Sequence, residues 1–479
     1  MLLYRKSVLY FLVFLIFGTL SLGRAFSVFS PLRLFGLPFY ITDVFILFSL
    51  PLAMKGFWDL RRLPGWFYAP FSLLFFLAEV YLFHGLLIDH SPYALRSAVL
   101  SVYLLFVPVV WFMFKRAFRP EYFLVLLVLA NVGSVIFGAG IGPQVWLANT
   151  RGFNLTLFYG VTIAFLLPFG LECLTDIRSR WLVWGITGIN VFMVINGCVR
   201  SSWAALIVLL VFYILIFRSK WKALIIAYGM IMISVGSLLL LQGVFVREGQ
   251  LRFVQRTQGT FYFITQTLDR VKALSRKSYV DKHGLGAKDF VLENAETRDI
   301  ELENAAEENA AEENAQDIMP LSEAAGNAYS NMTWRIGVWK ATFSAGMKSP
   351  LWGNGFSKLL IYDQSLVTAE IRGPGADSGI VPPHNEFLTV FYRMGLIGIV
   401  LFVWINGFVF WRGLRRLGGE SDPICRACLA GALGALVVWH IAAQFFDLID
   451  SPPTNIILWM LLGLVLVLLY GRDIERAEV

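Results

Sequence analysis

Charged residues are scarce in this chain. Of its 479 residues, 15% are charged and 57% are hydrophobic, whereas a typical soluble domain has about 25% charged residues. The mean hydropathy is +0.66, so the chain has far more apolar surface than one soluble core could bury. This composition excludes an ordinary cytosolic enzyme, a secreted disulfide domain and a disordered protein, and it indicates a chain whose solvent is lipid.

Cysteine is also rare. The four cysteines, Cys173, Cys198, Cys425 and Cys428, are too few and too scattered for a disulfide framework. Cys425 and Cys428 have the spacing of half a zinc site, but no second pair or histidine cluster completes it. The sequence also lacks a P-loop, a Rossmann fingerprint, an Asp-x-Asp pair and a defensible internal repeat. We therefore expect no metal and no cofactor.

Long apolar stretches are abundant. A transmembrane helix needs about 20 mostly apolar residues. The stretches that fit this length lie near 7–23, 36–54, 66–88, 97–114, 121–139, 153–172, 180–198, 202–217, 223–242, 386–411, 427–446 and 453–470. They predict an all-α, polytopic integral membrane protein with about 12 transmembrane helices.

Basic residues orient these helices. Lysine and arginine recur in every second short loop when the N-terminus is placed in the cytoplasm, and the tail after the last span contains Arg472 and Arg476. This positive-inside pattern stays in phase along the chain. It predicts that both termini are cytoplasmic, and it explains most of the net charge of +7 without nucleic acid.

One long segment interrupts the series of spans. We expect residues 1–242 to form helices 1 to 9, residues 243–384 to form a large periplasmic loop region with short helices, and residues 385–479 to form helices 10 to 12 and a cytoplasmic tail. Within the loop region, residues 251–276 fit an amphipathic helix at the membrane surface. Residues 293–317 are acidic and low in complexity, typical of a solvated insertion.

Few ionisable residues lie inside the apolar runs. The main ones are Asp43, Glu79, His84 and His440, and each is either a functional residue or a hydrogen-bonding partner of a neighbouring helix. Polar residues gather instead at the predicted outer ends of helices. This one-sided distribution indicates a site that faces the periplasm.

His384 stands at the mouth of the tenth predicted helix. A histidine with an ordinary pKa near 6.5 suits a general base, although capping and interfacial histidines are also common at helix ends. A rotation of about 100° per residue places His384, Leu388, Phe391, Gly395 and Gly398 on one face. We expect the two glycines to let another helix pack closely there.

Arginines form the second set of candidates. Arg335 and Trp339 lie one turn apart on a predicted short helix that ends at Pro350, and the arginine fork matches phosphate oxygens. Arg200 precedes Ser201 and Ser202, one of which we expect to cap the eighth helix, and the free N–H groups of that helix end beside Arg200 would form an anion site. Arg151 repeats this arrangement at the start of the sixth helix. Each arginine could equally form an ion pair or reach towards lipid headgroups.

These residues resemble a known family. His384 and Asn385, followed after nine residues by Gly395 and after two more by Gly398, look like the H[N/S/Q]-x9-G-x-x-G signature of the O-antigen ligases. The stretch from Arg335 to Gly355 is similar to the arginine helix and the Pro-x-x-Gly-x-Gly turn of the wider ligase and polymerase superfamily.

Two features depart from the family pattern. Residues 293–317 are an insertion without a counterpart in it. The ligase element Arg-x3-Leu is imperfect at Arg200, whose next suitable leucine is Leu206, whereas Arg96 and Arg151 have the required spacing. Which arginine fills that role stays open at this point.

The resemblance implies a glycosyltransferase of the bacterial inner membrane with its active site facing the periplasm. The donor would be a glycan on undecaprenyl diphosphate. The acceptor would be lipid A–core for a ligase, or the end of another glycan for a polymerase. His384 would be the catalytic base, with Arg335, Arg200 and Arg151 as candidates to hold the donor diphosphate. Asn385, Trp339, Gly395 and Gly398 would support them.

The same features separate the alternatives. The His–Gly spacing favours an O-antigen ligase, and an O-antigen or exopolysaccharide polymerase is the second interpretation. A transporter of lipid-linked glycans would place its polar site near the bilayer midplane, often between repeats. The sequence shows neither a polar cluster in the middle of its spans nor an internal repeat. A non-enzymatic scaffold for envelope assembly would tolerate the loss of His384. The expected partners are the lipid-linked donor, the acceptor and membrane lipids, but no nucleic acid.

Overall fold

The chain folds into two compact units. One consists of Met1–Leu240, Arg335–Leu366 and Pro374–Val479, and the other of Leu241–Trp334 and Val367–Gly373. The computed structural model describes residues 2–22, 26, 32–34, 37–90, 94, 99–115, 119–140, 153–196, 200–245, 335–356, 383–446, 448–449 and 452–478. Nearly all of these lie in the first unit. The predicted surface helix 251–276 and the insertion 293–317 fall outside the described residues.

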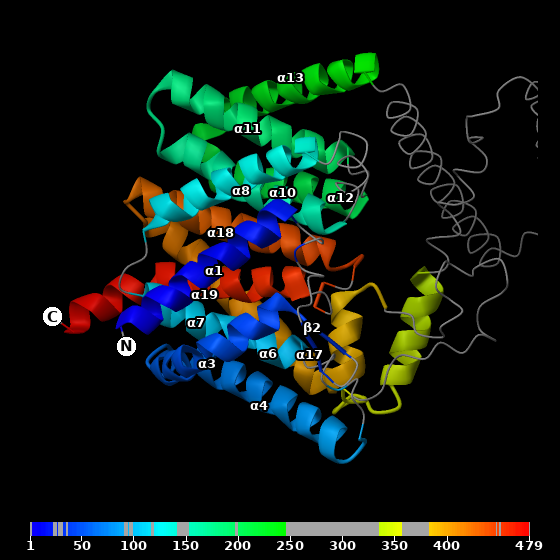
Figure 1. The fold of residues 1–479 in the computed structure, drawn as a ribbon. Helices are drawn as coiled ribbons and strands as arrows, with labels where there is room; N and C mark the ends of the chain where they lie inside the picture. Colours follow the sequence, from blue (N-terminus) through cyan, green and yellow to red (C-terminus); the bar gives the residue numbers. More distant parts are fainter. Residues whose placement is uncertain are drawn as a thin grey trace, which may run out of the picture. The chain divides into compact units, whose positions relative to one another are not determined.

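Helices account for most of the described chain (Figure 1). The first nine are α1 (Leu2–Leu22), α3 (Ile41–Leu60), α4 (Gly65–Leu87), α6 (Val99–Leu104), α7 (Phe106–Phe114), α8 (Pro120–Gly140), α10 (Phe153–Glu172), α11 (Ile177–Asn196) and α12 (Arg200–Ile216). A 3-10 turn at Arg218–Lys220 leads into α13 (Trp221–Phe245). The C-terminal helices are α17 (Glu386–Gly419), α18 (Pro423–Ala442) and α19 (Pro452–Glu478).

Each of the twelve predicted spans includes helical residues. Fewer than twelve of the described helices, however, have the length and hydropathy that a membrane span requires. Among the described residues, six helices are long and apolar enough to cross a membrane, or seven if the bent pair formed by α12 and the following helix counts as one span. The protein is therefore a membrane protein with several transmembrane helices, and the count of twelve stays a prediction. The predicted span 97–114 is broken at Leu105. Pro108 lacks an N–H group and its ring clashes with the carbonyl of Leu104, which is where α6 ends.

A small hairpin departs from the all-α prediction. Strands β1 (Leu32–Leu34) and β2 (Leu37–Phe39) pair antiparallel, with Leu32 opposite Phe39. The second strand occupies the start of the predicted span 36–54, so helix α3 begins only at Ile41. Asp43 accounts for this start, because its carboxylate accepts a hydrogen bond from the backbone N–H of Tyr40 at 2.9 Å. The Asp43 carboxylate also accepts one from Tyr103 at 2.8 Å, so this ionisable residue caps a helix.

Helix α18 lies at the centre of the first unit, between α10 and α19 (Figure 1). In the apolar parts of these helices, 72% of the residues of α18 and 78% of those of α19 are buried, compared with 28% for α4. Small residues permit this close packing, as is usual between membrane helices. A side chain on Gly431 would collide with Phe165 of α10, and one on Gly434 would collide with Tyr213 of α12.

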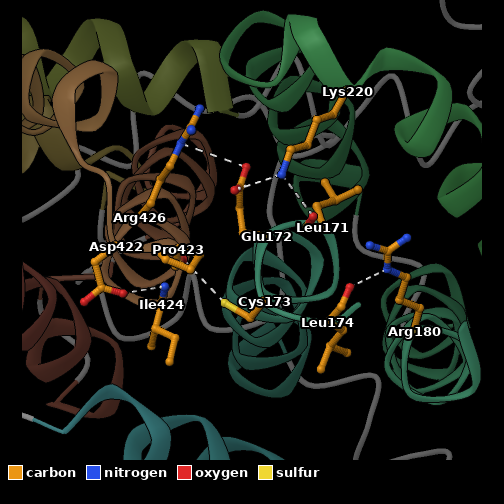
Figure 2. A network of polar contacts seen from close by, with 10 residues as sticks. All are labelled: Leu171, Glu172, Cys173, Leu174, Arg180, Lys220, Asp422, Pro423, Ile424 and Arg426. Carbon is orange, nitrogen blue, oxygen red and sulfur yellow. Dashed lines mark hydrogen bonds and ion pairs between the residues drawn. The ribbon is translucent and has the colours of Figure 1, made fainter. Parts of the chain in front are cut away.

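A polar network joins the end of α10 to the start of α18 (Figure 2). The carboxylate of Glu172, 5% exposed, lies 2.9 Å from Lys220 Nζ and 3.9 Å from Arg426 Nε. Asp422 caps α18 by accepting from the backbone N–H of Ile424 at 3.0 Å. These contacts fix one end of α18, whose other end leads to the residues described next.

Candidate active site

His384 occupies a strained turn immediately before α17. Its backbone has φ of 48°, a left-handed value that is uncommon for residues other than glycine. Asn385 is the N-cap of α17, because its side-chain oxygen accepts a hydrogen bond from Leu388 N at 3.1 Å. The histidine is therefore presented beyond the helix end, as the sequence predicted, and its strained backbone marks a candidate functional position.

Gly395 breaks the helix that the sequence treats as continuous. Its φ of 64° and ψ of −162° are non-helical and belong to a region that is essentially restricted to glycine. The predicted single face from His384 to Gly398 is therefore wrong, because the rotation is interrupted at Gly395. A side chain on Gly398 would collide with Met394. The two glycines were predicted to let a second helix pack closely against this face. In the structure they instead permit a kink in α17.

The Pro350–Gly355 turn fits into this kink. Four backbone hydrogen bonds connect the turn to α17. They join Asn354 N to Tyr392 O (2.8 Å), Gly355 N to Arg393 O (2.9 Å), Leu396 N to Pro350 O (2.8 Å) and Ile397 N to Leu351 O (3.3 Å). Gly353 and Gly355 have φ of 74° and 77°, values that glycine adopts without steric cost. The two motifs of the sequence resemblance therefore interlock, and we call this contact the clasp.

The clasp positions the helix that carries Arg335 and Trp339. Residues 335–346 are helical and run directly into the turn. Trp339 Nε1 donates to Pro383 O at 2.8 Å, next to His384. Phe343 stacks on Phe391 of α17, with ring centroids 5.6 Å apart. Arg335 and His384 are thus brought together from opposite ends of a stretch of about 50 residues.

The segment that follows α18 is a part of the site that no sequence motif predicted. Arg335 Nη1 donates to Phe445 O at 2.7 Å, and its guanidinium lies over the Phe446 ring, 5.4 Å from the centroid. Asn385 Nδ2 donates to Gln444 O at 3.2 Å. Residues 444–446 therefore hold both the arginine and the cap of the histidine turn. Ordinary backbone carbonyls make these contacts, so no sequence motif marks them.

Glu386 fastens the same segment to the histidine turn. It is fully buried, its backbone N–H donates to Ala443 O at 2.9 Å, and its carboxylate accepts from Ile449 N at 3.0 Å. This carboxylate is therefore directed into the structure, where it holds the segment that follows α18.

The surroundings of His384 favour its neutral form. Burial and, to a smaller extent, the positive charge of Arg335 together lower the pKa of His384 to about 4. The imidazole is therefore uncharged at neutral pH and able to accept a proton. A guanidinium beside a neutral imidazole is suited to bind an anionic substrate while the histidine takes a proton from a hydroxyl group.

The other predicted arginines are less well defined. Arg200 begins α12, but its side chain is not among the described ones, and Arg151 lies outside the described residues. The expected caps are wrong, because α12 already starts at Arg200 and both serines lie in its first turn. Ser202 Oγ instead hydrogen-bonds Thr156 Oγ1 of α10 at 3.1 Å.

Two other ionisable candidates have local partners. His440 Nε2 lies 3.2 Å from Asn406 Oδ1 of α17, inside the helical bundle. His84 Nδ1 lies 3.2 Å from Asp89 Oδ2, and its side chain is 55% exposed. Both pairs match the simpler interpretation of a histidine bonded to a neighbour.

A comparison with protein families gives one match that includes this region. A family profile described as O-antigen ligase matches residues 185–403. This match assigns residues 185–403 to the O-antigen ligase and polymerase superfamily. The matched range includes Arg200, Arg335, Trp339 and the residues from His384 to Gly398, whereas Arg151 lies outside it. Membership in this superfamily implies activity of the membrane glycosyltransferase type.

A comparison with curated proteins gives no match. The family match ends inside α17, so α18, α19 and the residues 443–449 lie beyond it. The family match therefore says nothing about the contacts that this segment makes with Arg335 and Asn385.

Proposed function

We propose that the protein is an O-antigen ligase, which transfers a glycan from undecaprenyl diphosphate to a sugar hydroxyl of lipid A–core. The observation that carries this proposal is the placement of a neutral, half-buried His384 beside Arg335. Arg335 donates to Phe445 O, and Asn385, the residue after His384, donates to Gln444 O. A proton acceptor and a phosphate-binding group are the two functions that the transfer needs. In the topology given by the basic loops, this site faces the periplasm of the bacterial inner membrane and both termini are cytoplasmic.

The proposed reaction is a single displacement. His384 takes the proton of the acceptor hydroxyl while the hydroxyl oxygen forms a bond to the anomeric carbon. The bond from that carbon to the phosphate oxygen breaks, and the electron pair leaves with the diphosphate. Arg335 stabilises the charge that develops on the leaving group. Attack opposite the leaving group inverts the anomeric carbon, and no nucleotide is required because the diphosphate already stores the driving force.

Deletion of the gene distinguishes a ligase from a polymerase. We expect cells that lack the protein to accumulate long glycan chains on undecaprenyl diphosphate, with unmodified lipid A–core at the surface. Gel electrophoresis of surface lipopolysaccharide and of extracted lipid-linked glycans measures both pools. Surface glycans with a single repeat unit would instead identify a polymerase, and an unchanged glycan profile would reject both enzymes.

The pH dependence of transfer should reveal the depressed pKa of His384. Since kcat/KM reports the free enzyme, a base with a pKa of about 4 predicts a flat profile at neutral pH and a decline only at acidic pH. Arg335→Gln removes a positive charge that lowers this pKa, so the decline should move to higher pH although the rate is reduced. Samples returned from acidic to neutral pH control for unfolding. An acid limb near pH 6.5 in the wild type, or a limb unmoved by Arg335→Gln, would contradict the assignment.

A further inference from the structure

An apolar cavity lies between helices on the side of the first unit that contains α1 and α8. Its volume is about 580 Å³, and its walls come from α1, α7, α8, α10 and α19. This volume falls in the range of about 300–1,000 Å³ that is typical of ligand sites. Several of its walls are also exposed at the molecular surface, including Val13 at 38%, Val125 at 54% and Leu129 at 53%. The cavity is therefore a groove open to the surrounding bilayer.

The shape of the groove fits a hydrocarbon chain. The lining residues of α1 run from Leu9 to Leu20, which corresponds to roughly 16 Å along a helix. The hydrocarbon core of a bilayer is about 30 Å thick, so the groove is about as long as one leaflet is deep. Its walls are aliphatic and aromatic residues with Thr19 as the main polar exception. Such walls bind apolar chains but offer a sugar almost nothing to hydrogen-bond.

One end of the groove carries a cation. Arg119 is the only charged residue among the lining residues in the described part of the chain. It is exposed and lies just before α8, where its guanidinium is 5.9 Å from the centroid of the Tyr122 ring, which also lines the groove. Arginine at a helix end binds lipid phosphates well. The neighbouring Lys115 is engaged differently, because its ammonium group pairs with Asp59.

From this arrangement we infer that the groove binds a phospholipid with an anionic headgroup, with one acyl chain between α1, α8 and α19 and the phosphate at Arg119. The charge of Arg119 complements the headgroup, and the apolar walls match the chain. Basic pockets between membrane helices commonly bind anionic lipids in this way. In the topology proposed above, Arg119 lies at the cytoplasmic surface, so the lipid belongs to the inner leaflet and the site is distinct from that of His384.

Two pairs of variants test the inference with the purified full-length protein in detergent. The first pair is Arg119→Gln and Arg415→Gln. Arg415 is an exposed arginine that also stacks on an aromatic ring, Trp411, at 3.7 Å, but it does not line the groove. The second pair is Ile16→Trp, which fills the groove, and Leu73→Trp, which adds the same bulk at an exposed position of α4.

Native mass spectrometry after addition of phosphatidylglycerol or phosphatidylcholine measures the bound lipid. We expect the wild type and Arg415→Gln to retain phosphatidylglycerol in preference to phosphatidylcholine. In Arg119→Gln, the ratio of bound phosphatidylglycerol to bound phosphatidylcholine should fall about five-fold. Ile16→Trp should retain less of both lipids, while Leu73→Trp behaves as the wild type. Equal behaviour of the two arginine variants would overturn the inference, as would undecaprenyl phosphate displacing the phospholipid. Arg119 is exposed, so its comparison remains informative even if Ile16→Trp folds poorly.

Discussion

His384→Asn is expected to leave a folded protein whose rate of glycan transfer is reduced by roughly 10²–10⁴-fold, the usual contribution of a general base. Asparagine tolerates the left-handed backbone conformation better than other residues do, so the φ of 48° at this position is compatible with the variant. An amide does not accept the proton of the acceptor hydroxyl at neutral pH. The measurement is transfer by purified protein from a lipid-linked glycan to lipid A–core.

The matched control is His84→Asn at the exposed end of α4. His84 lies next to Asp89 and is not part of the candidate site, so this variant should transfer glycan at the wild-type rate. His384→Ala is less informative, because alanine adds backbone strain at a positive φ. Wild-type activity of His384→Asn would eliminate the catalytic base, although the family assignment would still stand on the match to residues 185–403.

Local sequence signals predicted much of the local structure around the candidate site. Short-range patterns of apolar and polar residues predict the helical segments and the position of His384 just before a helix. They also predict the short helix that carries Arg335 and Trp339. Pro382 and Pro383 precede the histidine, and glycine follows Pro350 at the spacing of a turn. Such signals act within a few residues of chain, so they appear in the sequence without knowledge of tertiary contacts.

Contacts between distant segments were not predictable in the same way. Any residue type at 443–446 offers backbone carbonyls, so the bonds from Arg335 and Asn385 leave no trace in composition or spacing. The kink at Gly395 shows a related difficulty. Glycine in a membrane helix usually indicates close packing, and only the position of the Pro350–Gly355 turn reveals that this glycine instead adopts a non-helical conformation.

The clasp itself predicts the second large effect. Gly395→Ala should destabilise the fold and abolish most transfer, because a side chain would collide with the Leu351 backbone and the backbone conformation alone costs on the order of 1–3 kcal/mol for a residue other than glycine. Gly407→Ala in the same helix is the control, since nothing lies near its added methyl group. Thermal unfolding in detergent and the transfer assay measure both consequences, and equal stability of the two variants would show that the kink is not needed for folding.

The partner of Gly395 provides a test of the clasp as a unit. Gly353 has a φ of 74°, and a side chain there would collide with the backbone of Arg393 and Gly395. Gly353→Ala should therefore open the same set of backbone hydrogen bonds as Gly395→Ala. Substitutions that remove one shared interaction are not additive, so the double variant should be little less stable than either single variant. Fully additive losses would mean that the two glycines act separately, and the turn would then not be the element that holds Arg335 beside His384.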